Sequence, residues 1–389
     1  MVGGKLKRTL PKHGLSSVLL AFLSFVKKNV VLSVAVVAAC ITCLVIPPDN
    51  AYVGYFDFGT LACLFCTLAV VCAFRNISFF YILARSIVAC FGTARTAVIA
   101  LVFITFGGSM LLANDMALLT FLPLGYFVLD GTGMRKYMAY TFILQNVAAN
   151  LGGMLTPFGN PQNLYLYSRF NIPTSEFTAV MLPPFLVATV LIFAACFAVG
   201  RDKLTIKGEA IRLNVPRTVA YTLLFAFSIG MVFRIVPYLL GIVIVVAALL
   251  LLDRKALAQV DYPLLLTFAA FFIFAGNMAR IEPVRSFFEY LLGKSTLLFS
   301  VLSCQAISNV PSAILLSQFT SDYRDLLVGV NIGGLGTLIA SLASLITFRE
   351  YTKHEPGRSG HYIALFSLVN VLFLAVLIGF QFLYTHFAG

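Results

Sequence analysis

The stretch Asn150-Leu151-Gly152-Gly153 recurs 181 residues later as Asn331-Ile332-Gly333-Gly334. In each copy a threonine stands three residues after the second glycine, at Thr156 and at Thr337. Both copies interrupt long apolar segments, in which a run of glycine and asparagine has no packing role. In hydrocarbon, non-helical backbone persists only where protein covers it or where it borders a wet cavity. Paired interruptions at matching places in two halves of a chain indicate a solute site in a membrane carrier.

The composition is that of a membrane protein. Of the 389 residues, 60% are hydrophobic and 11% are charged, which excludes an ordinary soluble domain. Several apolar runs approach or exceed the roughly 20 residues that cross a bilayer as a helix. The clearest runs are residues 29–46, 177–200, 237–252 and 361–387. We therefore predict an all-α polytopic membrane protein with about nine full spans in the lipid bilayer.

Basic residues outnumber acidic residues by 27 to 15, which gives a formal net charge of +12. They are scattered in short loops instead of lining one polar face, so we exclude nucleic-acid binding and interpret them as topology signals. Basic residues before the first span predict a cytoplasmic N-terminus, and the most basic loop, 201–217, falls on the same side. The last span then leaves the C-terminus outside. The apolar stretch 15–26 is too short to span and is predicted to be an interfacial helix.

Residues that bind metals or carry out catalysis are sparse at membrane depth. The eight cysteines lie almost all within apolar runs, and Cys63-x-x-Cys66 has no second pair, so we interpret them as small hydrophobic residues. The four histidines fall near the ends of the chain or in the late loop. No Ser–His–acid arrangement supports hydrolysis. We expect no metal site, no cofactor and no enzymatic activity.

Two of the interrupted apolar segments are predicted to be re-entrant hairpins. The first, residues 97–128, is interrupted at Asn114-Asp115, and the second, residues 296–319, is interrupted at Ser308-Asn309. Basic residues flank the first hairpin on both sides, which predicts that it enters from the cytoplasm. The second is predicted to enter from outside.

The two Asn-x-Gly-Gly stretches are predicted to divide transmembrane helices in residues 137–167 and 326–348. A looser repeat relates residues 57–77 to 261–281, each with an acid, an apolar run, an arginine and an isoleucine. Because the first copy starts outside and the second inside, the two halves are predicted to be inverted repeats. Carriers of this architecture have their site at the interface between the repeats.

All four interruptions are expected to converge on one site. Broken helix ends expose N–H groups that attract anions and carbonyl groups that coordinate cations. Asn, Ser and Thr add neutral oxygens suited to Na⁺, and glycines admit close approach of the backbone. The residues predicted to bind the solute are Asn114, Thr156, Asn160, Asn163, Ser308, Asn309 and Thr337. The residues predicted to bind the coupling cation are Asn114, Asp115, Asn150, Gly152, Gly153, Asn309, Asn331, Gly333 and Gly334.

Asp115 is the one acid of the 15 that the predicted topology places deep within an apolar segment. A carboxylate inside the membrane is costly and marks a functional site by default. When ionised it would bind Na⁺, and when neutral it would carry a proton. A structural pairing with Asn309 or with an arginine is the alternative to a role in transport.

From about residue 30 to its end, the chain resembles the ion transporter superfamily, which includes divalent-anion/sodium symporters, citrate transporters, arsenite-efflux permeases and a class of sodium/proton antiporters. The resemblance is carried by Asn114-Asp115 with Pro123 downstream, Gly159-Asn160-Pro161-Gln162-Asn163, Ser308-Asn309 and the two Asn-x-Gly-Gly breaks. It implies an elevator-type homodimer with a scaffold domain and a mobile transport domain. The corresponding scaffold segments are residues 1–94 and 201–293, and the transport-domain segments are 95–200 and 294–389.

The hairpin tips depart from one branch of that superfamily. In the dicarboxylate symporters each tip is Ser-Asn-Thr, whereas here the tips are Ala113-Asn114-Asp115 and Ser308-Asn309-Val310. The first tip is more similar to the arsenite-permease and antiporter branches, and the Gly-Asn-Pro-Gln-Asn stretch to the citrate and anion branches. We therefore expect a carrier of a small anion, first of all a carboxylate, coupled to Na⁺ or H⁺. A sodium/proton antiporter and an arsenite or antimonite efflux permease are the alternatives.

Overall fold

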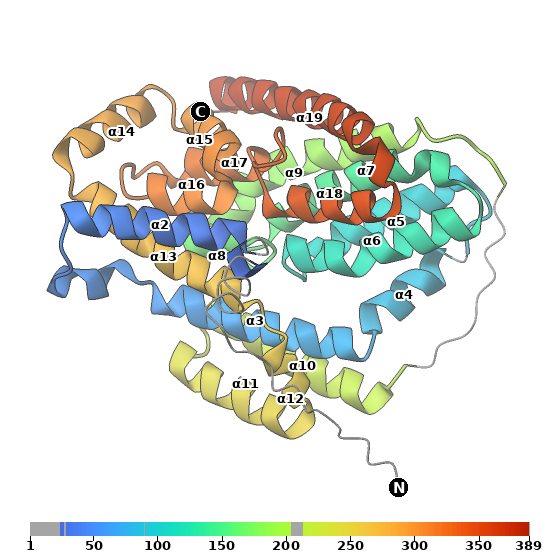
Figure 1. Cartoon of the computed structure of the whole chain (residues 1–389), viewed down its shortest axis with the longest axis horizontal. Coiled ribbons are helices and arrows are strands. Elements are labelled where there is room, and N and C mark those ends of the chain that lie inside the picture. Colours follow the sequence, from blue (N-terminus) through green and yellow to red (C-terminus); the bar gives the residue numbers. More distant parts are fainter. Residues whose placement is uncertain (1–23, 27–28, 89, 204–212, 389) are drawn as a thin grey trace, which may run out of the picture.

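The computed structural model describes residues 24–26, 29–88, 90–203 and 213–388 (Figure 1). These residues are mostly helical. They contain no β-strand, only an isolated bridge between Thr93 and Lys203. The predicted all-α fold is confirmed. Most of the predicted interfacial helix at 15–26, the lysines of the N-terminus and part of the basic loop after residue 203 lie outside the described residues.

One group of helices packs around α3 and α13. It comprises α2 (Val30–Val45), η1 (Asn50–Tyr55), α3 (Phe58–Asn76), α4 (Phe79–Val88), α10 (Val215–Val232), α11 (Tyr238–Leu252), α12 (Arg254–Ala258), α13 (Tyr262–Ala279) and α14 (Glu282–Lys294). Helix α2 packs along α13, while α10, α11 and α12 pack against α3. In Figure 1, α10 to α12 lie along the bottom and α14 at the upper left.

The second group is built around α7. It comprises α5 (Ala94–Ser109), α6 (Asn114–Gly131), η2 (Arg135–Tyr137), α7 (Met138–Gly152), η3 (Gly153–Leu155), α8 (Pro161–Arg169), α9 (Thr174–Cys196), α15 (Thr296–Ile307), α16 (Asn309–Leu316), α17 (Tyr323–Ile332), α18 (Leu342–His354), η4 (Pro356–Arg358) and α19 (Ser359–Ala388). Helices α5, α6 and α18 pack on α7, and α15 and α16 pack on α17. The two groups meet where α13 packs on α16, α3 on α8, and α4 on α5 and α6.

Five of the described helices are long and apolar enough to cross a bilayer, counted by length and composition alone. They are α3, α9, α10, α13 and the segment 356–387 that contains α19. Helices α2 and α11 have 16 and 15 residues, so each is about 22–24 Å long and shorter than the ~30 Å hydrocarbon core. Many large apolar side chains on α2, α11 and α19 are exposed, as expected of surfaces that face lipid acyl chains.

The looser sequence repeat has a structural counterpart at two helix starts. Asp57 caps α3 by accepting a hydrogen bond from the backbone N–H of Thr60, and Asp261 caps α13 by accepting one from Leu264. A side-chain oxygen at this position satisfies an N–H group that has no partner within the helix. The repeated acid therefore fixes the first turn of the central helix in each half of the first group.

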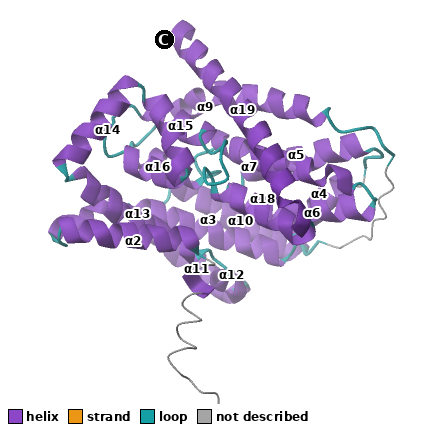
Figure 2. Ribbon diagram, turned by 45° about the horizontal axis from the view of Figure 1, so that its top comes forward, coloured by secondary structure: helices purple, strands orange, loops and turns teal. Residues whose placement is uncertain are grey.

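The predicted hairpins form two antiparallel helix pairs at opposite ends of the molecule. In Figure 1, α5 and α6 lie toward the right and α15 and α16 toward the left, while the loops that interrupt the helices gather in the middle (Figure 2). The first predicted interruption was placed too late, because helix α6 already begins at Asn114 and the turn consists of residues 110–113. The second falls on Ser308, whose φ of 75° breaks the helix in a region that L residues rarely adopt.

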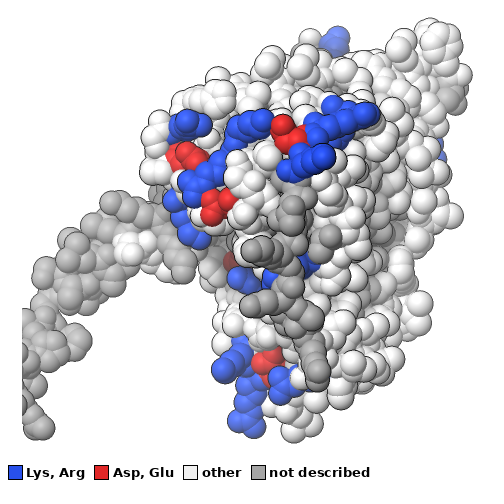
Figure 3. Space-filling model, turned by 90° about the vertical axis from the view of Figure 1, so that its right-hand side faces the viewer, with Lys and Arg blue, Asp and Glu red and all other residues white. Residues whose placement is uncertain are grey.

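Lysine and arginine side chains gather on the right-hand end of the molecule (Figure 3). Ion pairs form here where α6 ends and α7 begins, between Arg135 and Asp130 and between Lys136 and Asp202. The pKa of the Asp202 carboxyl is lowered, first by the hydrogen bond from Tyr137 and then by Lys136. This end is the one that the charge distribution predicts to face the cytoplasm.

Candidate functional site

A cavity of about 40 Å³ lies where four helices begin. Each helix contributes the residues at or next to its N-terminus: Asn114 and Asp115 of α6, Pro161 and Gln162 of α8, Asn309 and Val310 of α16, and Ser341 and Leu342 of α18. The facing wall comes from the first group of helices, with Val31 of α2 and Leu264 and Thr267 of α13. The cavity therefore lies between both hairpin tips, both helix breaks and the first group.

The Asn150 side chain connects three of these elements. Its Oδ1 accepts hydrogen bonds from Asn114 Nδ2 at 3.1 Å and from Ser341 Oγ at 2.9 Å. Its own backbone carbonyl accepts from Asn160 Nδ2 at 3.1 Å. All four residues are at most 3% exposed. Because buried amides are stable only when hydrogen-bonded, this cluster fixes the first hairpin tip relative to both breaks.

Asn331 has the equivalent place in the second half. Its Oδ1 accepts from Asn160 Nδ2 at 3.1 Å and from Gln162 Nε2 at 3.3 Å, and its Nδ2 donates to Asn163 Oδ1 at 2.6 Å. Asn160 and Ser341 are themselves 181 residues apart. They are the N-cap residues of α8 and α18, the helices that follow the first and the second break. Asn150 of the first break accepts a hydrogen bond from Ser341, and Asn331 of the second break accepts one from Asn160, so the two halves bond to each other crosswise.

The two threonines make matching contacts with the hairpins. Thr156 Oγ1 donates to the carbonyl of Met110 at 2.7 Å, and Thr337 Oγ1 donates to the carbonyl of Gln305 at 3.3 Å. Each carbonyl lies four residues before the asparagine that opens the second helix of its hairpin. The contact between hairpin and break is therefore built in the same way in both halves. Neither threonine lines the cavity.

Three of the four glycines in the breaks let the chain pass close to the hairpins, and Gly153 lets it pass close to the start of α8. A Cβ at Gly152 would clash with the carbonyl oxygen of Phe106, and one at Gly153 would clash with Asn160 Oδ1. In the second half, a Cβ at Gly333 would lie 3.0 Å from Cys304 Sγ. A Cβ at Gly334 would lie 3.1 Å from Asn309 Nδ2. These positions require close backbone approach, which only glycine provides.

Asp115 is the charged group at the cavity. It lies in the first turn of α6, and its backbone N–H donates to Asn114 Oδ1 at 2.9 Å. Its own Oδ1 atom is buried and has no hydrogen-bond partner among the described residues. Gln162 Oε1 and Asn160 Oδ1 are buried and unpartnered in the same way. Oxygen atoms of this kind are suited to a cation, a proton or a ligand hydroxyl group.

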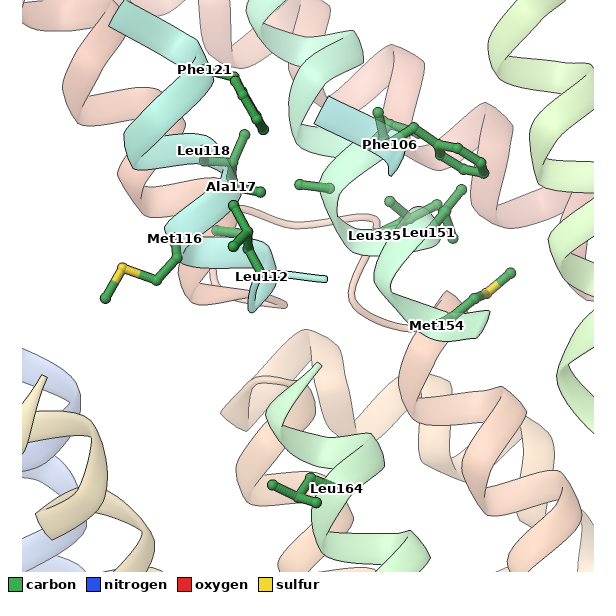
Figure 4. Close-up of a cluster of buried hydrophobic side chains, with 14 of the residues drawn as sticks. Phe106, Leu112, Met116, Ala117, Leu118, Phe121, Leu151, Met154, Leu164 and Leu335 are labelled. Carbon is green, nitrogen blue, oxygen red and sulfur yellow. The ribbon is translucent and has the colours of Figure 1, made fainter. Parts of the chain in front are cut away.

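Apolar packing holds the polar loops in place. Figure 4 shows Leu112 of the first tip and Met116 and Leu118 of α6 beside Leu151 and Leu335 of the two breaks. Apart from Met116, at 6%, none of these side chains is measurably exposed. The tight core around the tips limits the motion of individual side chains, so the amides keep their positions.

The predicted site residues separate into four sets. Asn114, Asp115, Ser308 and Asn309 line the cavity, and Asn150, Asn160 and Asn331 support it through hydrogen bonds. Asn163 does not line the cavity, and its Nδ2 donates to the carbonyls of residues 153, 154 and 156 within the same break. The threonines contact the hairpins, as do Gly152, Gly333 and Gly334, whereas Gly153 lies against Asn160 of its own break.

The prediction missed the apolar wall of the cavity and three of its polar residues, Gln162, Ser341 and Thr267. Gln162 was present in the quoted Gly-Asn-Pro-Gln-Asn stretch, but its side chain was assigned no role. Ser341 could have been found from the repeat offset, because it stands at the position equivalent to Asn160. The hydrogen bond from Ser341 Oγ to Asn150 Oδ1 joins the two halves of the chain and holds Ser341 at the cavity.

Comparison with known proteins agrees with a membrane carrier. Residues 18–321 match a family described as Citrate transporter. The chain is 30% identical to an uncharacterized transporter of Methanocaldococcus jannaschii over 332 residues, which are 83% of this chain and 89% of the relative. It is 32% identical to the Escherichia coli inner membrane protein YbiR over 280 residues, 70% of this chain and 74% of the relative. A shorter match, 32% over 143 residues, relates 36% of the chain to 29% of the silicon efflux transporter LSI3 of rice, Oryza sativa. The resemblance to the ion transporter superfamily is confirmed.

Proposed function

Because this chain belongs to the citrate transporter family, we propose that it is a secondary carrier of a small anion, with carboxylates as the first class to test. The coupling ion is Na⁺ or H⁺. The observation that carries the proposal is the cavity at which four helices begin and onto which Asp115 opens. No sequence motif or cluster among the described residues points to enzymatic chemistry instead.

The anion would bind to the helix N-termini. The first N–H groups of an α-helix have no partner within the helix, and the helix dipole adds partial positive charge there. Helices α6, α8, α16 and α18 all begin at the cavity, and its described lining contains no lysine or arginine. Neutral donors from Asn114 and Asn309 would complete the binding of a carboxylate or another oxyanion. Backbone groups would therefore supply the positive potential that other anion sites take from arginine.

The coupling cation would bind to the unpartnered oxygens. Asp115 Oδ1 and Gln162 Oε1 belong to residues that line the cavity, and both atoms are buried. A hard cation such as Na⁺ prefers oxygen ligands of this kind, and a proton on Asp115 would satisfy the same carboxylate. Either ion offsets the charge of an incoming anion. This mutual neutralisation gives a physical reason for the two to move together.

We propose that the hairpins α5/α6 and α15/α16 are re-entrant and belong to inverted repeats. The matching contacts of Thr156 and Thr337, and the crossed bonds of Asn150 and Asn331, support an internal twofold relation. In this arrangement the second group is the transport domain and the first group is the scaffold. The N-terminus is cytoplasmic, the C-terminus is outside, and two copies of the scaffold form a homodimer. These assignments follow the charge pattern and the family architecture.

The structure corresponds to a closed state of the cavity. A volume of about 40 Å³ admits a few water molecules or a small ion, but not a tricarboxylate such as citrate. Val31, Leu264 and Thr267 close the side that faces the scaffold. Citrate can therefore enter only if the hairpin tips move away from α2 and α13, as they would when a transport domain slides along a scaffold.

Two alternatives have specific support. An aspartate whose buried Oδ1 atom has no hydrogen-bond partner, in a cavity that no basic side chain of the described residues lines, favours a sodium/proton antiporter. The small cavity volume and the partial likeness to a silicon efflux transporter favour export of a small hydroxylated weak acid, a class to which arsenite and antimonite belong.

Uptake into proteoliposomes tests the proposal. The purified protein would be reconstituted, and labelled citrate and succinate uptake would be measured under an inward Na⁺ gradient and under a pH gradient. We expect uptake driven by one gradient and its loss in Asn114→Ala, whereas Glu289→Gln on the exposed face of α14 serves as the matched control. Sodium flux driven by a pH gradient without any anion would contradict the proposal and support the antiporter. Export of arsenite without carboxylate uptake would support the efflux permease.

A further inference from the structure

A second cavity, polar and about 430 Å³ in volume, shares helices α8 and α13 with the cavity at the hairpin tips, here called the tip cavity. Gln318, which also lines the larger cavity, lies just beyond the end of α16, a helix that lines the tip cavity. On α8, Gln162 lines the tip cavity and Arg169 the larger cavity, two helical turns or about 10 Å further along the axis. The larger cavity thus continues the path from the tips toward the end of the molecule that the charge pattern places outside.

A pair of aromatic rings separates the two cavities. Tyr165 of α8 and Phe272 of α13 lie with ring centroids 5.5 Å apart, and both line the larger cavity. Tyr165 is held by a 2.9 Å hydrogen bond with Ser317 Oγ and by a 3.3 Å bond from Gln318 Nε2. Both rings are 2% exposed, so they fill the groove between the transport helix α8 and the scaffold helix α13.

Two charged side chains line the larger cavity, Asp57 and Arg169, and they differ in how many hydrogen bonds they already make. Asp57 accepts hydrogen bonds from the backbone N–H and from the hydroxyl of Thr60, at 2.9 and 2.7 Å, in capping α3. The Arg169 guanidinium makes a single long bond of 3.4 Å to Gln318 Oε1 among the described residues. Arginine has five N–H donors in a fixed planar arrangement, so most of its capacity is free for a ligand.

More positive charge lies around this cavity. Arg280 donates to the hydroxyl of Tyr55, which lines the cavity, and Arg234 lies in the adjoining cavity that shares Tyr238 with it. Arginine side chains that gather at the mouth of a cleft raise the local concentration of anions and speed their association. The acid nearest to Arg280 is Asp49, which already pairs with it at 2.7 Å.

We propose that this cavity is an anion-capture site, in which Arg169 binds a carboxylate from outside before the solute reaches the hairpin tips. The inference rests on the proposed function and adds to it a second binding site with its own residue. Capture would occur while the Tyr165–Phe272 pair still closes the passage. Arg169 would form a bidentate pair with the carboxylate.

The chain contains no tryptophan, which gives this proposal a direct optical test. A Tyr238→Trp variant places the only tryptophan on the wall of the cavity, and a Tyr384→Trp variant on α19 is the matched control. Fluorescence of the full chain in detergent would be titrated with citrate, succinate and sulfate, with chloride at equal ionic strength. We expect a saturable change with the carboxylates in Tyr238→Trp and none in Tyr384→Trp.

Arg169→Gln in the Tyr238→Trp protein should weaken the apparent affinity for citrate about tenfold or more, because a charge-assisted bidentate pair is lost. Arg169→Lys should recover part of the loss. Asn114→Ala in the same protein should keep the response, because the tip cavity is a separate site. Absence of a saturable change, or an unchanged affinity in Arg169→Gln, would overturn the proposal. A response that persists in a protein unable to take up any probe would instead count against the proposed transport function alone.

Discussion

At the scale of single residues, buried amides determine how the polar centre is built. Asn150 accepts side-chain hydrogen bonds from two different elements, and Asn331 accepts two from the start of α8. A buried amide of this kind acts as a junction, because its removal leaves donors on several elements without a partner. Asp115 differs from these residues because its carboxylate Oδ1 has no partner among the described residues. The asparagines therefore hold the cavity, and the aspartate remains free to bind an ion.

Asn150→Leu tests the structural role. Leucine has a similar volume but cannot accept hydrogen bonds, so Asn114 Nδ2 and Ser341 Oγ would each lose an acceptor, at a cost of about 1–3 kcal/mol per buried group. We expect a melting temperature several degrees lower in detergent. Asn370→Leu is the control, since Asn370 is buried on α19 and its Nδ2 donates only to a carbonyl of its own helix. An equal loss in both variants would contradict the junction role.

Asp115→Asn tests the functional role. The substitution keeps size and polarity but removes the charge that would bind Na⁺ or carry a proton. We expect the melting temperature to stay close to that of the wild type and gradient-driven uptake to fall to background. Glu289→Gln, an exposed acid on α14, should leave uptake unchanged. Undiminished ion-dependent uptake in Asp115→Asn would show that the carboxylate plays no part in coupling.

The sequence predicted much of this centre. The repeat offset identified Asn150 and Asn331, and the cost of a charge in hydrocarbon identified Asp115. The roles of Thr156 and Thr337 could not be predicted, because a threonine hydroxyl bonds whichever acceptor the fold brings near. Here those acceptors are carbonyls of the hairpins, at Met110 and Gln305.

At the scale of elements, glycines without a Cβ allow the two helix breaks to pack directly against the hairpins. The chain at Gly152 passes so close to the carbonyl of Phe106 in α5 that no Cβ fits, and a Cβ at Gly333 would lie 3.0 Å from Cys304 Sγ in α15. The sequence predicted that four segments were interrupted, and the structure agrees for all four. The start of α6 was misplaced, because the turn before it contains ordinary apolar residues, at 110–113, instead of glycine or proline.

Gly152→Ala measures how tightly hairpin and break are packed. The added methyl group must displace backbone, and overpacking of this kind costs about 1–3 kcal/mol. We expect a lower melting temperature together with weaker uptake. Gly379→Ala on α19 has open space around the new methyl group, and alanine is the better helix former, so this control should be neutral or slightly more stable. A Gly152→Ala protein with wild-type stability and uptake would contradict the close approach described for this break.

At the scale of the whole molecule, length and composition established that the chain belongs in a membrane, and the family comparison agrees. The number of spans could not be predicted as well, because the breaks divide apolar runs into helices shorter than a bilayer. The solute could not be predicted either, since it depends on the shape of the cavity, which the sequence does not give. The polar centre, in contrast, lies at the contact between the groups, as paired interruptions in two halves of a chain predict.

The central claim is that one cavity binds an anion and a coupling ion together, and thermal stability of the detergent-purified protein tests it most directly. Melting temperatures would be recorded in Na⁺, Li⁺ and a series of pH values, each with and without citrate, succinate, sulfate and arsenite. A ligand that binds only the folded state at 100 times its Kd stabilises it by about 2.7 kcal/mol. We predict that a carboxylate raises the melting temperature by several degrees only when Na⁺ or a lower pH is also supplied, and that Asp115→Asn removes this dependence. A Na⁺ shift that grows with pH and ignores every anion would contradict the claim.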